Sequence, residues 1–421
     1  MLSSLPPSGY FTVIYVLTLL CKIVGVPFLG LVVMNNLLPL IMVKRKNTGN
    51  DGTMLSFRQK TPISSYTKFQ ITLSPTLSLS EILERIEERV EKMLEEDSLL
   101  NIDSNTKKYT RRNLKDIIHT YKPSTEPPTF STVSFSSINT NVPVHVFLSE
   151  KSHSIFFFID HCIADGLTMY NEVVGPVLGN PRFKLAKRPI YVPLITEFHQ
   201  LYVLTRMFSI YTGSLLSGQK ALPRLEKEMQ YPVFHRMELE RIKEVKNELK
   251  VPVAAVIMAV LVKHLGKSLK KGRSNIKICL SYAFQNENSF NNYSFIILDI
   301  RDNLPIDVMA RNIHRQLFNR RHEINTMYHL LQLPTGSGGV TKAVQQTICD
   351  AYIAMTMVPD GEKEKGEVNI MESMKNEHYS ISTGLNMTAV SIGDKVYVSS
   401  KVGLVDIERS TFEKELMVSG Y

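Results

Sequence analysis

The sequence predicts an α/β (α+β) protein with two halves behind an apolar N-terminal segment, and three observations support this fold class. Its 421 residues suffice for two ordinary domains, or for one large fold of two halves with an ample core. From Tyr66 onward, runs typical of strands and runs typical of helices alternate along the chain. The first 50 residues differ, because they contain one long apolar stretch.

Composition indicates a globular protein, with 43% hydrophobic and 21% charged residues. The net charge of +9 is moderate, and the basic residues are spread along the chain. This distribution gives little support to nucleic-acid binding and favours a positive face toward anionic lipid or a nucleotide. The four cysteines are far apart, which predicts neither a zinc site nor a disulfide framework and indicates a reducing compartment: Cys21, Cys162, Cys279 and Cys349.

Residues 1–50 are interpreted as a membrane anchor and a linker. Residues 10–43 are almost wholly apolar and exceed the roughly 20 residues that one membrane span needs. Gly25 and Pro27 interrupt them, so one long span and a re-entrant pair of short helices both remain open. A cleaved signal peptide fits less well, because the stretch is too long and lacks a basic start. The basic residues 44–46 that follow place the rest of the chain in the cytosol.

The first half, residues 51–185, has the pattern of strands packed with one long helix. Tyr66 to Leu73 alternates as a strand does, and a capping box at Ser78 opens a helix that runs to about Glu96. Further strands are expected at 130–135 and 142–148. This half ends in the stretch that carries the candidate chemistry.

That stretch, residues 154–170, contains His161 and, four residues later, Asp165 followed by Gly166, in the form H-x-x-x-D-G. The apolar run 155–159 before it predicts a strand buried on both faces. The residues after it can form a helix with one apolar face. The histidine is therefore expected where a core strand ends and a helix begins, a common location for catalytic groups.

The spacing of this hexad suits acid–base chemistry. Histidine is the best general base near pH 7 for a hydroxyl or an amine. A carboxylate four residues on can fix the local backbone, usually by pairing with a distant arginine, and a glycine lets a substrate chain pass close to the main chain. A lone histidine is more often a core or surface residue, but its position after a buried strand favours the functional interpretation. Cys162 is interpreted as a small buried apolar residue rather than as a nucleophile.

Residues 186–225 connect the halves. Within them, 193–216 predict a helix that lies on a membrane or packs against the core, and both interpretations remain open. The second half, residues 226–421, is expected to contain helices at 238–249, 253–269 and 307–321 and strands at 276–280, 296–300, 352–359, 386–392 and 395–401. A basic run at residues 263–273 is either a solvated helix end or a site for the phosphates of coenzyme A.

The H-x-x-x-D-G hexad resembles the signature of the acyltransferase superfamily related to chloramphenicol acetyltransferase. The order of the later segments resembles the wax ester synthase/diacylglycerol acyltransferase family in particular. That family usually has two adjacent histidines, of which the second is the base; here Asp160 replaces the first and His161 retains the second. Residues 291–295 resemble its Gly-Asn segment, with Asn291 in place of the glycine, and Thr356 to Gly361 stand where it has Ser-Asn-Val-Pro-Gly-Pro.

The resemblance implies two chloramphenicol-acetyltransferase-like halves with mixed sheets and a central tunnel. It implies His161 as the catalytic base, Asp165 as a structural member of the catalytic pair, and Gly166 and Thr356 beside the substrate. It implies no metal and no cofactor, with acyl-CoA as a co-substrate.

The function implied is a membrane-associated O-acyltransferase that moves a fatty acyl group from acyl-CoA to a lipid hydroxyl. A long-chain alcohol would give a wax ester, and diacylglycerol would give triacylglycerol. The enzyme would sit on the endoplasmic reticulum through residues 10–43, with its catalytic part facing the cytosol. The alternative is a catalytically weak or inactive lipid- or acyl-CoA-binding relative, which Asp160, Asn291 and Met357 favour. A third interpretation is an acyltransferase with a soluble acceptor.

Overall fold

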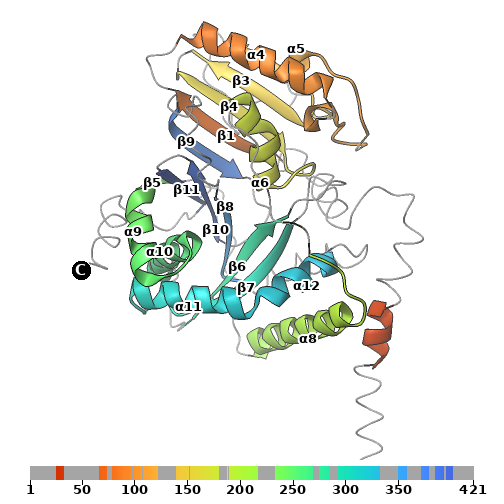
Figure 1. Cartoon of the computed structure of the whole chain (residues 1–421), viewed down its shortest axis with the longest axis vertical. Helices are drawn as coiled ribbons and strands as arrows, with labels where there is room; N and C mark the ends of the chain where they lie inside the picture. Colours follow the sequence, from red (N-terminus) through yellow and green to blue (C-terminus); the bar gives the residue numbers. More distant parts are fainter. Residues whose placement is uncertain are drawn as a thin grey trace, which may run out of the picture.

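The computed structural model describes the chain in stretches that hold the helices and strands of two lobes. These stretches are residues 25–32, 66–73, 78–96, 98–106, 108–121, 139–150, 152–179, 187, 189–216, 233–268, 275–284, 293–331, 349–357, 371–378, 385–392 and 395–401. The two lobes are stacked along the long axis of the molecule, and each is built on one sheet (Figure 1).

The first lobe has a five-stranded sheet in the order β2-β3-β4-β1-β9. Its strands are β1 (Tyr66–Leu73), β2 (Ile118–Tyr121), β3 (Val144–Ser149), β4 (Ser154–Asp160) and β9 (Met371–His378). The sheet is mixed, because β2 is parallel to β3 whereas the other pairs are antiparallel. The central strand β4 is buried at all seven positions, as its apolar run predicts.

Helices cover one face of this sheet. They are α4 (Leu79–Glu95), the 3₁₀ turn η4 (Leu99–Asn101), α5 (Leu114–Ile117), α6 (Gly166–Met169), the π-helical turn η5 (Tyr170–Val174) and α7 (Gly175–Val177). Ile82, Ile86 and Val90 of α4 pack in one core with Phe69 and Phe157 of the sheet. Their spacing of four residues puts them on one side of the helix, which is the apolar face that the sequence predicts.

The second lobe has a six-stranded mixed sheet in the order β5-β11-β10-β8-β6-β7. Its strands are β5 (Val233–Glu238), β6 (Ile276–Ala283), β7 (Tyr293–Ile300), β8 (Ala351–Met357), β10 (Leu385–Ile392) and β11 (Lys395–Lys401). One face packs against α9 (Leu239–Leu249), α10 (Val253–Ser268) and α11 (Ile306–Asn319). The other face is covered at β6 and β7 by α8 (Ile195–Leu216) and α12 (Arg321–Leu331).

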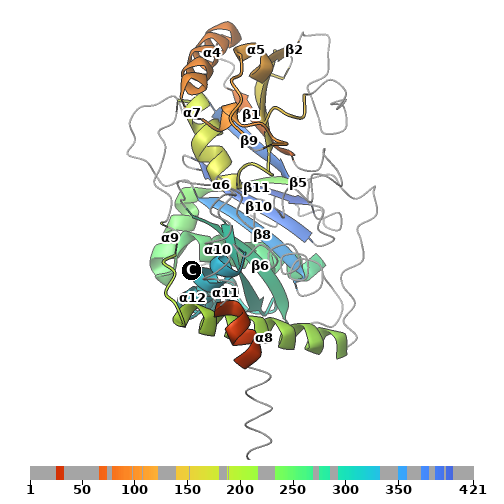
Figure 2. The same cartoon turned by 90° about the vertical axis from the view of Figure 1, so that its right-hand side faces the viewer.

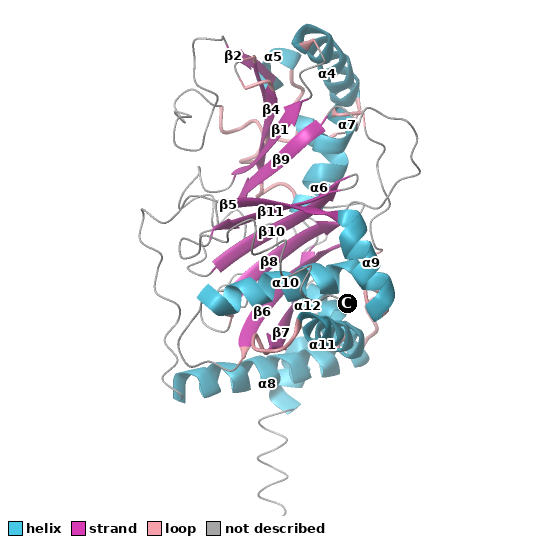
Figure 3. Ribbon diagram, turned by 90° about the vertical axis from the view of Figure 1, so that its left-hand side faces the viewer, coloured by secondary structure: helices cyan, strands magenta, loops and turns pink. Residues whose placement is uncertain are grey.

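The two lobes share elements where they meet. β9 comes from residues 226–421 of the sequence, yet it pairs with β1 and completes the first sheet. It lies at the junction between the two groups of strands (Figure 3). On the second sheet, Val390 of β10 and Tyr397 of β11 belong to the core of the first lobe. One face of the second sheet is therefore covered partly by α8 and α12 and partly by the first lobe.

Most predicted elements are confirmed with small shifts of their ends. Ser78 precedes α4 as its N-cap, but the predicted capping box is wrong, because the Ser78 hydroxyl lies 2.6 Å from that of Ser80 and makes no cap. β2, β5, β9 and α12 were not predicted. The strand expected at 130–135 lies outside the described residues, as does the linker expected at the end of residues 1–50.

The expected anchor, residues 10–43, is described only at 25–32, which form a short helix. This helix lies against α8 at the end of the second lobe (Figure 2). No helix within the described ranges is both long and apolar enough to cross a bilayer.

Candidate functional site

The turn that follows β4 positions His161. Asp160 ends the strand, and its amide donates to the carbonyl oxygen of Pro143 at 2.8 Å. The chain then bends sharply, because the amide of Ile163 donates back to the carbonyl oxygen of Asp160 at 2.9 Å. Since β4 is paired on both sides by β1 and β3, the position of this turn is fixed by the centre of the sheet.

The carboxylate of Asp160 holds the same turn. Asp160 is fully buried, and its Oδ1 accepts a hydrogen bond from the amide of Cys162 at 3.0 Å. Aspartate commonly stabilises a turn in this way, by bonding the backbone two residues on. Asp160, which stands where the resembled family has its first histidine, therefore contributes to holding His161 in place. The sequence alone showed the substitution but not this contact.

Asp165 caps the helix that leads away from the site. It is the N-cap of α6, its Oδ1 accepts from the amide of Thr168 at 2.9 Å, and its carbonyl accepts from the amide of Met169 at 2.8 Å. Such a cap satisfies an amide that the helix leaves without a partner. Asp165 is only 4% exposed. The five residues between Asp160 and Gly166 are thus fixed at both ends by buried carboxylates.

Burial sets the protonation of His161. The residue is half-buried, and its Nδ1 is shielded from water. Burial lowers the pKa of the imidazole below its ordinary value, although a hydrogen bond to its own backbone and the charge of Asp160 oppose the shift. A lowered pKa favours the neutral imidazole, which is the form that a general base needs.

Open space adjoins Gly166, the first residue of α6. A methyl group added at this Cα would meet no atom within 4 Å. The glycine is thus not required by close packing of its surroundings. Among the described residues, none fills the space next to the Cα of Gly166.

The hexad lies where the two lobes meet, since α6 sits between the sheets in both Figure 1 and Figure 2. Across the junction, Thr356 of β8 pairs in register with Val390 of β10, whose side chain packs in the first lobe. The side chain of Thr356 itself lies outside what the structure describes, so its contact with a substrate stays a prediction.

Tyr352 is a candidate residue of the functional site that the sequence did not indicate. It lies on β8 opposite Cys279 of β6. Burial raises the pKa of Tyr352, and the charges of Cys279 and Asp165 add to the shift. The tyrosine of the second lobe is therefore within electrostatic reach of the Asp165 carboxylate of the first. Only the strand pattern of residues 352–359 could have drawn attention to it.

Lys263, the first residue of the basic run at the end of α10, makes structural hydrogen bonds. The Nζ of Lys263 donates to the carbonyl oxygens of Asp302 at 3.3 Å and Leu304 at 3.0 Å. Lys263 thereby ties α10 to the loop after β7 and is not available to coenzyme A. The side chains of the other basic residues of this run lie outside the described part of the chain.

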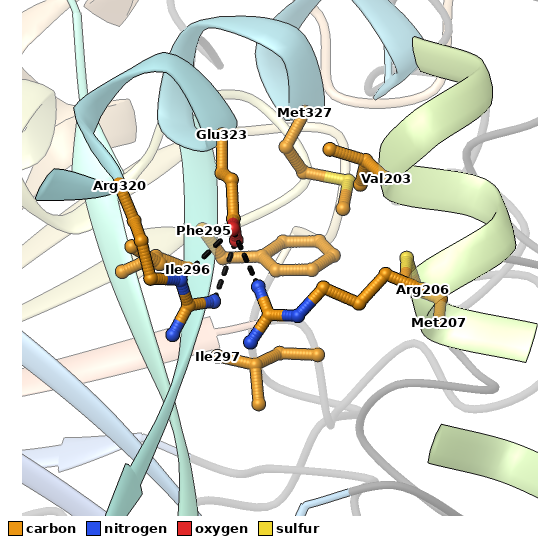
Figure 4. Close-up of a pocket in the computed structure, with 9 residues that line it drawn as sticks. All are labelled: Val203, Arg206, Met207, Phe295, Ile296, Ile297, Arg320, Glu323 and Met327. Carbon is orange, nitrogen blue, oxygen red and sulfur yellow. Dashed lines mark hydrogen bonds and ion pairs between the residues drawn. The ribbon is translucent and has the colours of Figure 1, made fainter. Parts of the chain in front are cut away.

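A small cavity lies between α8, α12 and β7, away from the hexad (Figure 4). Glu323 of α12 points into it between two arginines: its Oε1 is 2.5 Å from Arg206 of α8, and its Oε2 is 2.5 Å from Arg320. The cavity holds about 20 Å³, room for one water molecule and not for an acyl chain. We therefore interpret it as part of the packing of α8.

Comparison with known proteins gives matches in structure but not in sequence. No family model matches the chain, and no curated protein sequence matches it. The TRI3 trichothecene 15-O-acetyltransferase from Fusarium sporotrichioides is similar with a TM-score of 0.60 at 12% identity, over 89% of this chain and 93% of that one. The starter condensation domain of rhizomide synthetase, in complex with C8-CoA and Leu-SNAC, is similar with a TM-score of 0.52 at 9% identity, over 88% and 93%.

Polyketide synthase associated protein 5 from Mycobacterium tuberculosis is also similar, with a TM-score of 0.53 at 12% identity over 84% of this chain and 92% of that one. At such identities the likeness shows the fold alone. The chain has the two-lobed fold of the condensation-domain and chloramphenicol-acetyltransferase-like acyltransferases, which the sequence resemblance implied. The narrower resemblance to wax ester synthases stays a prediction.

Proposed function

We propose that this protein is an O-acyltransferase that moves an acyl group from acyl-CoA to a hydroxyl acceptor, with His161 as the general base. One observation supports this most strongly. His161 lies in a turn that two buried carboxylates fix, at the junction of the lobes, in the hexad whose Gly166 adjoins open space, and burial lowers its pKa. A general base needs both a fixed position and a pKa below the working pH.

In the proposed mechanism His161 removes the proton of the acceptor hydroxyl as its oxygen attacks the thioester carbonyl of acyl-CoA. The tetrahedral intermediate then collapses, the carbon–sulfur bond breaks, and the protonated His161 returns the proton to the departing thiolate. The products are an ester and free coenzyme A. No covalent enzyme intermediate is needed, because both substrates meet at one site.

The neighbouring residues have separate roles in this proposal. Asp165 is a positioning residue that acts through the backbone of α6. Gly166 leaves room for a substrate chain beside the main chain. Thr356 is proposed to contact the substrate or the oxyanion that forms during the attack.

We further propose a lipid acceptor, either a long-chain alcohol or diacylglycerol, and a long-chain acyl donor. The apolar residues 10–43 support this, because an enzyme held at a bilayer meets acceptors that dissolve there. Acyl-CoA as donor is supported by the structural neighbour bound to C8-CoA. We also propose a position at the endoplasmic reticulum membrane with the catalytic part facing the cytosol; the basic residues 44–46 support this orientation under the positive-inside rule.

A second candidate is a protein of the same fold that binds acyl-CoA or lipid without turnover. Met357 favours it, because the resembled family has an asparagine at this place in β8 and a methionine cannot donate its hydrogen bonds. Asp160 does not favour it, since its carboxylate supports the turn that holds the base.

The test supplies radiolabelled long-chain acyl-CoA, with either a fatty alcohol or diacylglycerol, to membrane fractions that carry the protein. The His161→Ala variant is compared with His314→Ala, a matched loss of a histidine on α11 in the other lobe. Ester formed by wild type and His314→Ala but not by His161→Ala would support the acyltransferase proposal. The acceptor that yields ester would show whether the product is a wax ester or triacylglycerol. Bound acyl-CoA with no ester from any of the proteins would favour the second candidate.

A further inference from the structure

Helix α8 has apolar side chains on its outer side as well as on the side that packs against the second lobe. Among its described side chains, Thr196, Glu197 and Gln200 are buried, and both Glu197 and Gln200 are fully so. On the opposite side Phe198 is 64% exposed and Tyr202 is 50% exposed. Val203 and Met207 form the inward apolar stripe that a surface helix of a globular protein usually has, so the exposed aromatic residues are the departure from that pattern.

The outward residues of α8 continue into a larger surface. The helix at 25–32 lies beside α8, where Leu31 packs with Val203 and Met207 (Figure 2). Its own outward side chains are apolar as well. We call the combined surface the apolar end face; it consists of Val26, Leu29, Ile195, Phe198, Tyr202 and Phe208, each between 50% and 68% exposed.

We propose that the apolar end face docks onto the surface of a phospholipid bilayer. The face is contiguous with the apolar residues 10–43, of which 25–32 are the described part. The helix at 25–32 therefore brings the described part of that segment to this end of the molecule. A large exposed apolar patch on one side of a protein marks an interaction site rather than ordinary surface.

The chemistry of the face fits lipid better than a protein partner. The one acid of α8, Glu197, is buried, so the face presents no carboxylate of this helix to anionic head groups. Tyrosine is enriched at membrane interfaces because it has an apolar ring and a polar tip, and phenylalanine is common on the buried face of helices that lie in the interface. Basic residues 44–46 follow the segment in sequence and suit an anionic leaflet.

A cluster of ion pairs joins the apolar end face to the rest of the second lobe. Glu323 of α12 binds Arg206 of α8 on one side and Arg320 on the other (Figure 4). The carboxylate is 9% exposed, so water screens the cluster little. Docking through α8 would therefore set the orientation of the whole second lobe on the membrane, not only hold it there.

This inference concerns a surface and does not require that the protein turns over acyl-CoA. Binding of the whole chain to vesicles would not test it, because residues 10–43 could hold the protein there without help from α8. The test must measure whether α8 itself enters the interface. The sequence offers a direct route, since it contains no tryptophan.

The experiment uses the full chain with Phe198→Trp, reconstituted on vesicles of phosphatidylcholine and phosphatidylserine. The control is Tyr109→Trp, an aromatic residue that is 57% exposed in the first lobe, far from α8. Brominated phosphatidylcholine quenches an indole that reaches the acyl region of the bilayer. We expect a blue shift and severalfold stronger quenching for Phe198→Trp than for Tyr109→Trp.

Equal, weak quenching in both proteins would overturn the proposal. A second pair of results would also overturn it. In the first, iodide fails to quench the fluorescence of the Phe198→Trp indole before vesicles are added. In the second, the protein is a dimer in solution and the Phe198→Glu variant is a monomer. That result would make the face an interface with a second copy. Ester formation is measured separately on the same vesicles, so loss of activity cannot be confused with loss of docking.

Discussion

Burial lowers the pKa of His145 and of His161 in the first lobe, as it also does for His119, but His145 and His161 differ in their place in the fold. His145 is the second residue of β3, is 1% exposed, and its Nδ1 is 3.1 Å from the Nε2 of His119. His161 is half-buried and lies just beyond the end of β4, in the hexad whose last residue, Gly166, adjoins open space. A lowered pKa thus shows only that a histidine is buried. The position of His161 at the junction of the lobes is what makes it a candidate base.

The largest difference between the two histidines is expected in the rate of acyl transfer. His161→Ala should lower single-turnover ester formation by about 10²- to 10⁴-fold, the usual contribution of a general base. His145→Gln should leave the rate at 25 °C and pH 7 nearly unchanged, because the side chain faces His119 within the sheet. Comparable losses in both variants would show that the comparison is wrong.

Acid stability should depend on His145 instead. Burial and the charge of His119 lower the pKa of His145 to about 3. The folded pKa lies below the unfolded value of about 6.5, so this contribution to stability is present above pH 6.5 and is lost as the pH falls toward 3. Between pH 7 and pH 5 the free energy of unfolding should drop by about 2 kcal/mol from this group.

Urea unfolding at the two pH values measures that drop. In His145→Gln the part of the pH dependence that comes from this residue should disappear, because glutamine does not titrate. His161→Ala should keep it. An unchanged slope in His145→Gln would assign the acid sensitivity to other groups.

Asp165, in contrast to both histidines, should affect stability and catalysis together. Asp165→Ala removes the N-cap of α6 and should cost about 1 kcal/mol of stability. It should also lower kcat more than it raises KM, since the residue positions the turn rather than binds substrate. Asp165→Ser retains a capping oxygen and should recover most of the stability. Recovery of stability by serine without any recovery of kcat would assign the carboxylate a role beyond the cap.

The smallest effect on stability is expected at Gly166. Because a Cβ there would meet no atom within 4 Å, Gly166→Ala should change the free energy of unfolding by less than about 0.5 kcal/mol. The methyl group would project into the space proposed for the substrate, so kcat/KM for a long acceptor should fall severalfold. An unchanged kcat/KM would place the substrate path elsewhere.

The strand, turn and helix around His161 could be predicted because their signals are local. The apolar run at 155–159 is contiguous, and its polar boundary falls where β4 ends. The contact of Asp160 with the Cys162 amide could not be predicted, since it depends on the geometry of the turn. The identity of a residue is visible in the sequence, but the atom to which it bonds is not.

β9 shows why other parts of the fold were missed. Its sequence, MESMKNEH, has no apolar alternation and several charges. It forms a strand because β1 supplies backbone hydrogen bonds, and β1 lies far away in the sequence. Edge strands held mainly by backbone pairing leave little trace in side-chain patterns. For α8 the helix was predicted correctly, but only the structure shows which side chains face outward.

The pH dependence of kcat/KM tests most directly the claim that His161 acts as a neutral base. Burial lowers the pKa of His161, so the rate should be flat from pH 6.5 to pH 8 and should fall only below 6.5, as the imidazole becomes protonated. The residual activity of His161→Ala should lack this acid limb. A rate that still rises between pH 7 and pH 9, or an acid limb that persists in His161→Ala, would contradict the account.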